Sequence, residues 1–299
     1  MSTLAPLTRD EELFLQLLSC ALHQELPNPD DFVGLDKASW RRIHRLAKGH
    51  AVPAFIGDRI LTLPKEALPS RNMCLMIFSE IELTRRANAY LTKALGELRK
   101  TYDAAGLPFI LLKGLGLGTF YPSPDLRTGG DLDTLFHSAD DYEYANDLLA
   151  HAGYKLHEES EVRYGHTAFT YGRTIVENHG RAVFFDHKRH NRYFDALVRE
   201  AIDTQSLVSQ QHGDYTIATL PHELNVVYVF IHLFFHWLHW GVGFRQYSDW
   251  LLMMTKLQGT LDTAKILRYA EDLDILYPMQ LFAQAAELYL QVSPEIFPF

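Results

Sequence analysis

Two aspartates separated by a single residue give the strongest indication of chemistry in this sequence. Asp131 and Asp133 alternate with Leu132 inside an apolar run, which is the period-two pattern of a strand with one buried face. Both carboxylates should therefore point to the same side of a sheet. Two anions that close repel each other unless a cation lies between them or one takes up a proton. The pattern indicates a site for a hard divalent ion, and Mg²⁺ is the usual choice where phosphates are handled.

The alternative for an Asp-x-Asp pair is a solvated strand face. Two features favour a site instead. Aspartate is disfavoured in strands, and the neighbouring residues are those of a core element, namely Leu132, Leu135 and Phe136.

A second candidate lies just upstream, where the apolar run Phe109–Leu112 ends in Lys113-Gly114. Backbone amides at a helix start can approach a phosphate closely where glycine leaves room, and a lysine adds a point charge. Glycine-rich turns after strands are also common without a ligand. The spacing matches neither a Walker A loop nor a dinucleotide fingerprint.

The elements that must position these residues follow from hydrophobic periodicity and from the Gly, Pro and polar clusters between apolar runs. Expected helices are Glu11–Leu26, Ala38–Leu46, Val52–Leu63, Asn72–Tyr102, Leu115–Phe120, Ser138–Ala152, Tyr193–Ile202, His222–Trp240, Arg245–Leu257 and Asp262–Leu290. Expected strands are Phe109–Leu112 and Asp131–Phe136, followed by a hairpin of His166–Tyr171 and Thr174–His179. This order predicts an α+β fold with a helical region over 1–106, an α/β core over 107–215 and a second helical region over 216–299.

Composition narrows the class of protein. A hydrophobic fraction of 47% can supply a large core, and a formal charge of −9 argues against bulk binding to nucleic acid or anionic membranes. The two cysteines fit a reducing compartment. The most apolar segment, Val226–Trp240, is too short for a membrane span, and the N-terminus lacks a signal-peptide pattern. A cytoplasmic protein without a membrane partner is expected.

Several segments resemble one known family. Phe109–Leu117 and Leu126–Asp133 resemble the bacterial family of uncharacterised nucleotidyltransferases, for which Leu-Arg-x-x-Gly-Asp-hydrophobic-Asp is a specific marker. Val176–His179 is similar to its Glu-x-His segment, and Gly241–Trp250 to its late Gly-x-Arg-x-x-x-Asp segment. The similarity covers most of the chain. It departs from the wider superfamily, which includes polymerase-β-like enzymes, at the first turn, where members often have Gly-Ser or Gly-Gly.

The resemblance implies a nucleotidyltransferase fold, with a mixed sheet core flanked by N-terminal and C-terminal helical regions. It also implies a Mg²⁺-dependent transferase, with Mn²⁺ as the other candidate ion. Such an enzyme moves a nucleoside monophosphate from an NTP, ATP among them, to a hydroxyl of a small molecule, a saccharide or a protein. The alternative is an inactive nucleotide-binding or regulatory module of the same fold. A metal-dependent hydrolase that uses the same carboxylates is a third hypothesis.

In that family the metal-binding and catalytic carboxylates would be Asp131, Asp133 and a third on a neighbouring strand. We assign the third to Glu177, which shares one face of the hairpin strand with His179. Asp186 is the rival. His179 could position a substrate oxygen, although a lone strand histidine is more often a hydrogen-bonded structural residue.

Nucleotide-binding roles are implied for Lys113, Gly114, Arg127 and Gly130. Arg127 could neutralise a triphosphate through a bidentate contact, and a solvated loop charge is the alternative. Glycine at position 130 would allow a ligand to approach the backbone closely.

Downstream polar residues have more modest interpretations. His232, His236 and His239 are three or four apart, so one helical face could display all three. We expect them to line a surface or pocket between regions, since a zinc site would need a further ligand. Arg245 and Asp249, four apart, indicate an ion pair on a helix face.

Overall fold

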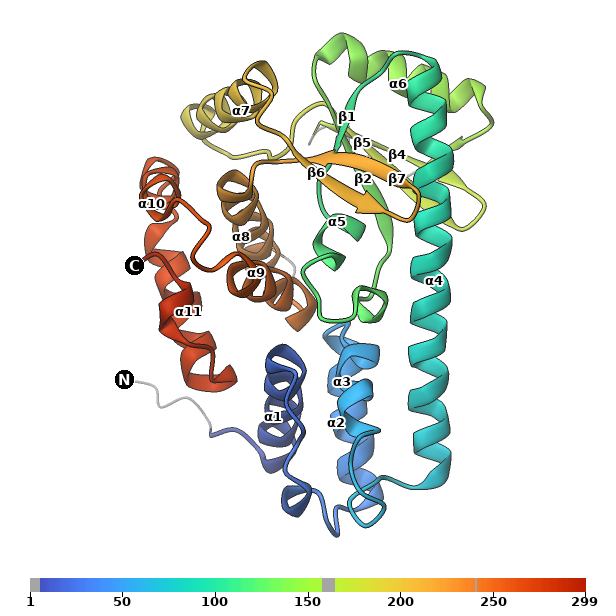
Figure 1. The fold of residues 1–299 in the computed structure, drawn as a ribbon, viewed down its shortest axis with the longest axis vertical. Coiled ribbons are helices and arrows are strands. Elements are labelled where there is room, and N and C mark those ends of the chain that lie inside the picture. Colours follow the sequence, from blue (N-terminus) through green and yellow to red (C-terminus); the bar gives the residue numbers. More distant parts are fainter. Residues whose placement is uncertain (1–5, 158–164, 240) are drawn as a thin grey trace.

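A computed structural model describes residues 6–157, 165–239 and 241–299 (Figure 1). Its strands are β1 (Phe109–Leu111), β2 (Asp131–Phe136), β3 (Lys155–Leu156), β4 (His166–Tyr171), β5 (Thr174–His179), β6 (Val208–His212) and β7 (Tyr215–Thr219). Its α-helices are α1 (Arg9–His23), α2 (Lys37–Gly49), α3 (Pro53–Ile60), α4 (Arg71–Ala104), α5 (Leu115–Gly118), α6 (Ala139–His151), α7 (Lys188–Asp203), α8 (His222–His239), α9 (Phe244–Leu257), α10 (Thr263–Asp272) and α11 (Leu276–Leu290).

The strands form one mixed sheet in the order β3-β4-β5-β2-β1-β7-β6. At its centre β2 pairs with β5 in parallel, and Asp133 lies opposite Glu177 in the register. On its other side β2 pairs with β1 in the antiparallel sense, with Leu135 opposite Ile110. Because aligned residues on adjacent strands project from the same face, Asp133, Glu177 and Leu135 share one face of the sheet.

Each face of the sheet packs into its own hydrophobic cluster. On one face Leu132, Phe136 and Val176 pack with buried residues of α4 and α6. On the other face Ile110 and Leu135 join a larger cluster that includes the N-terminal helices and α8 to α11. Asp131 and Asp133 share this second face with Leu135, and Asp131 lines a cavity together with residues of α8 and α9. Residues two apart on a strand project to the same face, so the carboxylates of Asp131 and Asp133 point to the same side of β2.

The 34-residue helix α4 supports the sheet from behind the site. The hydroxyl of Tyr102, near its C-terminal end, donates a 2.7 Å hydrogen bond to Oδ1 of Asn178 on β5, and Thr134 on β2 donates to the same oxygen at 2.9 Å. The amide of Asn178 donates to Asn146 on α6 at 2.9 Å. Asn178 lies between Glu177 and His179 in sequence, so this buried network fixes the strand that carries them.

The predicted α+β class is confirmed, and the described part of the chain contains nearly every expected element. Helix α7 begins at Lys188, earlier than the expected Tyr193. The expected single helix over 262–290 is two helices, because Asp274 adopts φ +57° between α10 and α11 and stops the first of them. Trp240, the expected end of α8, lies outside the described residues.

The hairpin of β6 and β7 was not expected from the sequence. Strand β7 pairs with β1 in parallel, so the sheet continues to Thr219, past the expected boundary at residue 215. Within the described ranges, no helix has both the length and the hydropathy needed to cross a membrane.

Replacing Tyr102 by phenylalanine tests the anchoring of β5. Removing one buried hydroxyl should lower the free energy of unfolding by about 0.5–1.5 kcal/mol, the usual net contribution of such a hydrogen bond. Urea denaturation curves with unchanged m-values would measure it. Tyr90→Phe is the matched control, since its exposed hydroxyl on the same helix accepts only a long 3.4 Å bond from the Arg173 amide. Equal losses in both variants would contradict the anchoring role.

Candidate active site

Asp133 is the most deeply buried acid of the site. Its side chain is fully buried, and its Oδ1 lies 2.9 Å from Nζ of Lys113 and 3.0 Å from Nε2 of His179. Lys113 follows β1 and His179 ends β5, so the two strands beside β2 each bring one nitrogen to the same oxygen. The second oxygen, Oδ2, is buried and has no hydrogen-bond partner among the described residues.

These contacts determine the charges. Burial alone would raise the pKa of Asp133, but the Lys113 charge and the hydrogen bond with His179 hold it well below its ordinary value. Burial likewise opposes the charge on Lys113, and Asp133 outweighs it, so the pKa of Lys113 is raised. The pKa of His179 is also raised, because hydrogen bonds to Asp133 and Glu177 outweigh its burial. The Lys113 ammonium and the His179 ring therefore both face the Asp133 carboxylate.

Glu177 completes a group that fits a metal ion. Its Oε2 lies 3.6 Å from Nε2 of His179, and one ligand atom each from Asp133, Glu177 and His179 lie within 4.8 Å of one another. Oxygen ligands with one imidazole nitrogen suit a divalent cation, and the unpartnered Oδ2 of Asp133 supplies an acceptor for it. The rival Asp186 is exposed in the segment before α7.

Asp131 lies beside this group and is not one of its three members. It lines a cavity together with Glu177 and Lys113. The negative charge of Asp133, followed by burial, raises the pKa of Asp131 to about 6, while Lys113 acts in the opposite direction. The Asp131 carboxylate is therefore held beside another anion, which is the situation that a bound cation relieves.

The cavity in front of the acids has a volume of ≈ 250 Å³, several times the ~30 Å³ that one water occupies. The sheet side supplies acids and a lysine, and α8 and α9 supply the opposite wall. Its lining includes Lys113, Gly114, Arg127, Asp131, His166, Glu177, His232, His236, Arg245 and Asp249. Besides Glu177, four residues with predicted nucleotide-binding or metal-binding roles thus line one cavity: Lys113, Gly114, Arg127 and Asp131.

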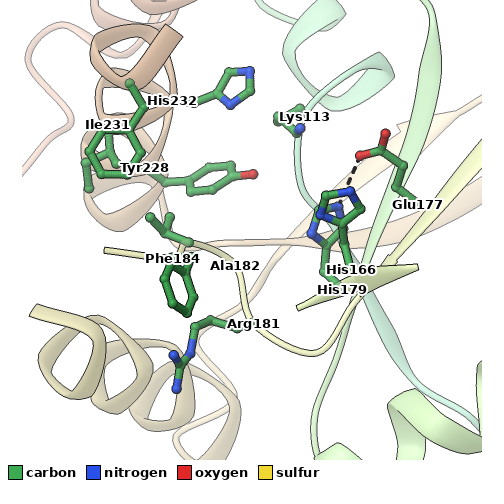
Figure 2. Close-up of a pocket in the computed structure, with 12 residues that line it drawn as sticks. Lys113, His166, Glu177, His179, Arg181, Ala182, Phe184, Tyr228, Ile231 and His232 are labelled. Carbon is green, nitrogen blue, oxygen red and sulfur yellow. Dashed lines mark ion pairs between the residues drawn. The ribbon is translucent and has the colours of Figure 1, made fainter. Parts of the chain in front are cut away.

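A second cavity of ≈ 180 Å³ adjoins the first and shares Lys113, Glu177 and His232 with it. Figure 2 shows Tyr228 and His232 projecting from α8 toward Lys113 and Glu177. The remaining lining is mostly apolar and includes Phe184, Ile231 and Phe235. Glu177 is the acid that lines both spaces, and two adjoining spaces could hold two reactants.

Three glycines near the site differ in how much space a side chain would have. Gly114 adopts φ +57°, and a Cβ there would lie 3.0 Å from the carbonyl oxygen of Asp131, so the turn after Lys113 requires glycine. Gly129 packs against α4, where a Cβ would meet Asn88 at 2.8 Å. Gly130 is exposed, with open space around the position of a Cβ. Close approach of a ligand is therefore open at Gly130, whereas Gly129 serves packing.

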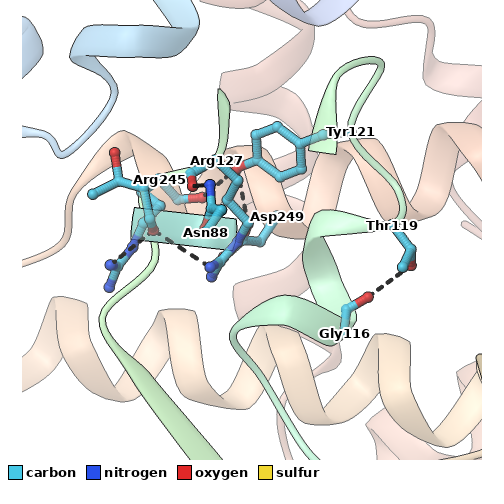
Figure 3. A network of polar contacts seen from close by, with 8 residues as sticks. Asn88, Gly116, Thr119, Tyr121, Arg127, Arg245 and Asp249 are labelled. Carbon is cyan, nitrogen blue, oxygen red and sulfur yellow. Dashed lines mark hydrogen bonds and ion pairs between the residues drawn. The ribbon is translucent and has the colours of Figure 1, made fainter. Parts of the chain in front are cut away.

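Arg127 is buried and forms a bidentate ion pair with Asp249 of α9. Its Nε lies 2.7 Å from Oδ1, and its second terminal nitrogen lies 2.8 Å from Oδ2 (Figure 3). The hydroxyl of Tyr121 donates to the same Asp249 at 2.8 Å, and the Asn88 amide donates to the Arg127 carbonyl at 2.8 Å. The pair fastens the loop before β2 to α9 and α4.

Two expectations are corrected by this geometry. Arg127 is not a solvated loop charge, and Asp249 pairs with Arg127 across the fold instead of with Arg245 on its own helix. A spacing of four residues along a helix makes an ion pair between Arg245 and Asp249 possible. The guanidinium of Arg127 instead forms two parallel hydrogen bonds with Asp249, and such bidentate pairs are the stronger ones.

The three histidines of α8 separate in the structure. His232 and His236 line the cavity with ring centroids 4.4 Å apart, whereas His239 is exposed near the helix end. Burial and the Lys113 charge hold the pKa of His232 well below its ordinary value, and burial lowers that of His236. Both rings are therefore neutral, and among the described residues they join no metal-binding group.

Sequence reasoning missed three contributors to the site: His166, Tyr228 and Arg245. The hairpin register could have indicated His166, since it pairs with His179. Tyr228 lies four residues before His232, so the helical spacing of the histidines also included it. Arg245 was predicted to form an ion pair with Asp249, so no role in the site was predicted for it.

Comparisons with known proteins give the family context. The family model described as "Uncharacterised nucleotidyltransferase" matches residues 36–291, which include the whole sheet and helices α2 to α11. No curated protein matches the sequence. Among solved structures, the chain is similar to the "Crystal structure of an antigenic nucleotidyltransferase-like protein from Paracoccidioides brasiliensis", with 14% sequence identity and a TM-score of 0.40. The alignment covers 68% of this chain and 93% of that chain.

Replacing Arg127 by methionine tests the buried ion pair. The change leaves the Asp249 carboxylate buried without its counter-charge, so the free energy of unfolding should fall by about 3–5 kcal/mol. Adding Asp249→Leu should recover much of that loss, because the stranded charge is then removed as well.

Arg181→Met provides the control in the same chemical denaturation series. Arg181 pairs with Asp195 at 2.8 Å in a partly exposed position, where an ion pair contributes only about 0.2–1 kcal/mol. If Arg127→Met lowered the free energy of unfolding no more than Arg181→Met does, the buried ion pair would not contribute to the stability of the fold.

Proposed function

We propose that this chain, which belongs to the family of uncharacterised nucleotidyltransferases, transfers a nucleoside monophosphate from an NTP to a hydroxyl group of an acceptor. The acceptor oxygen attacks the α-phosphorus, the bond to the β-phosphate oxygen breaks, and pyrophosphate leaves in line. The observation that carries the proposal is the state of Asp133. Its Oδ2 is buried, lacks a hydrogen-bond partner among the described residues, and lies in a group with Glu177 and His179.

Mg²⁺ or Mn²⁺ held by Asp131, Asp133 and Glu177, with His179 able to join them, would neutralise the triphosphate and stabilise the charge that develops on transfer. The residues present fit such an ion because several carboxylates offer oxygen ligands to it. One of these oxygens, Oδ2 of Asp133, is buried and has no other partner within the described residues.

Glu177 is assigned the proton transfer. Its carboxylate lies at the junction of the two cavities, so it can orient the acceptor hydroxyl and accept its proton. His179 contacts both Glu177 and Asp133 and so holds the two carboxylates in a fixed arrangement. Asp186 is exposed and lines neither cavity, so it is assigned no part.

The phosphate side is assigned to Lys113, Gly114 and Gly130. Lys113 stays protonated because Asp133 raises its pKa, and its position at the cavity wall lets it attract the leaving phosphates. The turn at Gly114 keeps the backbone close to Asp131. Arg127 also lines the cavity, where its charge is paired with Asp249, and its bidentate contacts fix the loop before β2.

A label-transfer screen tests the enzyme assignment. NTPs labelled at the α-phosphate are incubated with Mg²⁺ or Mn²⁺ and with small-molecule, saccharide and protein acceptors. The double variant Asp131→Ala/Asp133→Ala should lose transfer by about 100-fold or more, because metal-assisted charge stabilisation contributes several kcal/mol to the barrier.

The charge-matched control is Asp140→Ala/Asp141→Ala, which removes two neighbouring acids from the first turn of α6, away from both cavities. It should transfer label as the wild type does. Transfer that is equal in the wild type and the Asp131/Asp133 variant would exclude these carboxylates from catalysis. Nucleotide binding with no transfer to any acceptor would favour the inactive module.

The choice of the third carboxylate is tested by a pair of isosteric changes. Glu177→Gln should reduce the rate of transfer by about 10²–10⁴-fold, the range that a positioned general base contributes. Asp186→Asn should leave it unchanged. Rates are compared at saturating nucleotide, so that a weaker affinity is not mistaken for slower chemistry. The reverse order of effects would assign the role to Asp186.

A further inference from the structure

Arg245 occupies an unusual place at the start of α9. It is the second residue of that helix, and its side chain lines the larger cavity opposite Lys113, Asp131 and Glu177. Figure 3 shows it beside the fastened pair of Arg127 and Asp249. The proposed function as stated above gives it no role.

The guanidinium of Arg245 has little to compensate its charge. Within the described residues the guanidinium makes one weak hydrogen bond, of 3.4 Å, from a terminal nitrogen to the Thr128 carbonyl, and its buried Nε has no hydrogen-bond partner there. None of the ion pairs between described residues includes Arg245, because Asp249 is engaged by Arg127. A buried charged donor left unpaired is costly unless a ligand pairs with it.

The groups around Arg245 cannot replace that missing partner. His232 and His236 on the adjacent wall are neutral, since burial lowers the pKa of both. Asp131 lines the same cavity, and the Arg245 charge acts to lower its pKa, but the two side chains form no ion pair within 4.0 Å. Among the described residues, Arg245 on the wall formed by α8 and α9 therefore has no ion-pair partner within 4.0 Å, while the acids are on the sheet side.

We propose that Arg245 binds the polyphosphate of the nucleotide, at the phosphates that leave as pyrophosphate. An anion in this cavity would have Lys113 on the sheet side and Arg245 on the helix side. A guanidinium suits phosphate because its planar fork gives two parallel hydrogen bonds, and Nε is one of the donors of that fork. This inference rests on the proposed function, since it names how the same cavity holds the triphosphate.

The test measures binding of inorganic tripolyphosphate, ATP and adenosine by isothermal titration calorimetry in the presence of Mn²⁺. Arg245→Met should weaken tripolyphosphate and ATP by about 10–100-fold, the range for hydrogen bonds to charged groups. Adenosine affinity should not change. Arg268→Met is the control, because Arg268 is exposed on α10 and lines neither cavity.

Arg245→Lys provides a second variant that keeps the charge and loses the fork. It should bind tripolyphosphate with an affinity between those of the wild type and Arg245→Met, and it serves alone if the methionine variant does not fold. Wild-type affinity for tripolyphosphate in either variant overturns the inference, and so does a wild-type protein that fails to bind tripolyphosphate.

The inference and the proposed function fail in different ways. Tripolyphosphate binding that depends on Arg245, without label transfer to any acceptor, keeps the phosphate site and removes the transferase. Label transfer by Arg245→Met with an unchanged KM for the nucleotide keeps the transferase and removes the assignment of Arg245.

Discussion

The buried carboxylate of Asp133 is the constraint on which the site depends. A charge placed in the middle of a sheet is tolerated only where opposite charges meet it, and here Lys113 and His179 meet one of its two oxygens. These partners come from the strands on either side of β2: His179 from β5 and Lys113 from just after the end of β1. The strand order therefore places the carboxylate between the two nitrogen donors. The second oxygen has no such partner within the described chain, which leaves it free to accept a contact from the proposed cation.

The two faces of the sheet have different tasks. Behind the acids, the Asn178 network and a dry apolar cluster hold β2 and β5 in register. In front of them, helices α8 and α9 close the cavity, and their distance from the sheet is set by the pair of Arg127 and Asp249. The loop that precedes β2 is thus fixed by a residue more than a hundred positions later in the chain. Positive charges then have separate uses: Arg127 holds the loop, and Arg245 faces the cavity.

Local patterns predicted most of the fold. The alternation around Asp131 and Asp133 gave the limits of β2, and Ser138 marked the start of α6, where its hydroxyl accepts from the Asp141 amide. Long-range partners could not be predicted in this way. The spacing of Arg245 and Asp249 indicated a pair on one helix, yet a better donor arrives from another region of the chain. The β6–β7 hairpin was missed because strands such as Val208–His212 are polar on one side and short.

Helix α4 links the two halves of the molecule. Its first part contributes Ile77 and Ile81 to the larger cluster, and its last turns contribute Leu95 and Tyr102 to the cluster under the sheet. At about 1.5 Å per residue, 34 residues make a rod of roughly 50 Å. Because one continuous helix packs into both clusters, disorder that spreads along it from one cluster disturbs the packing of the other. A lesion among the first three helices would then reach the acidic strands through a shared backbone, with no relay of side chains in between.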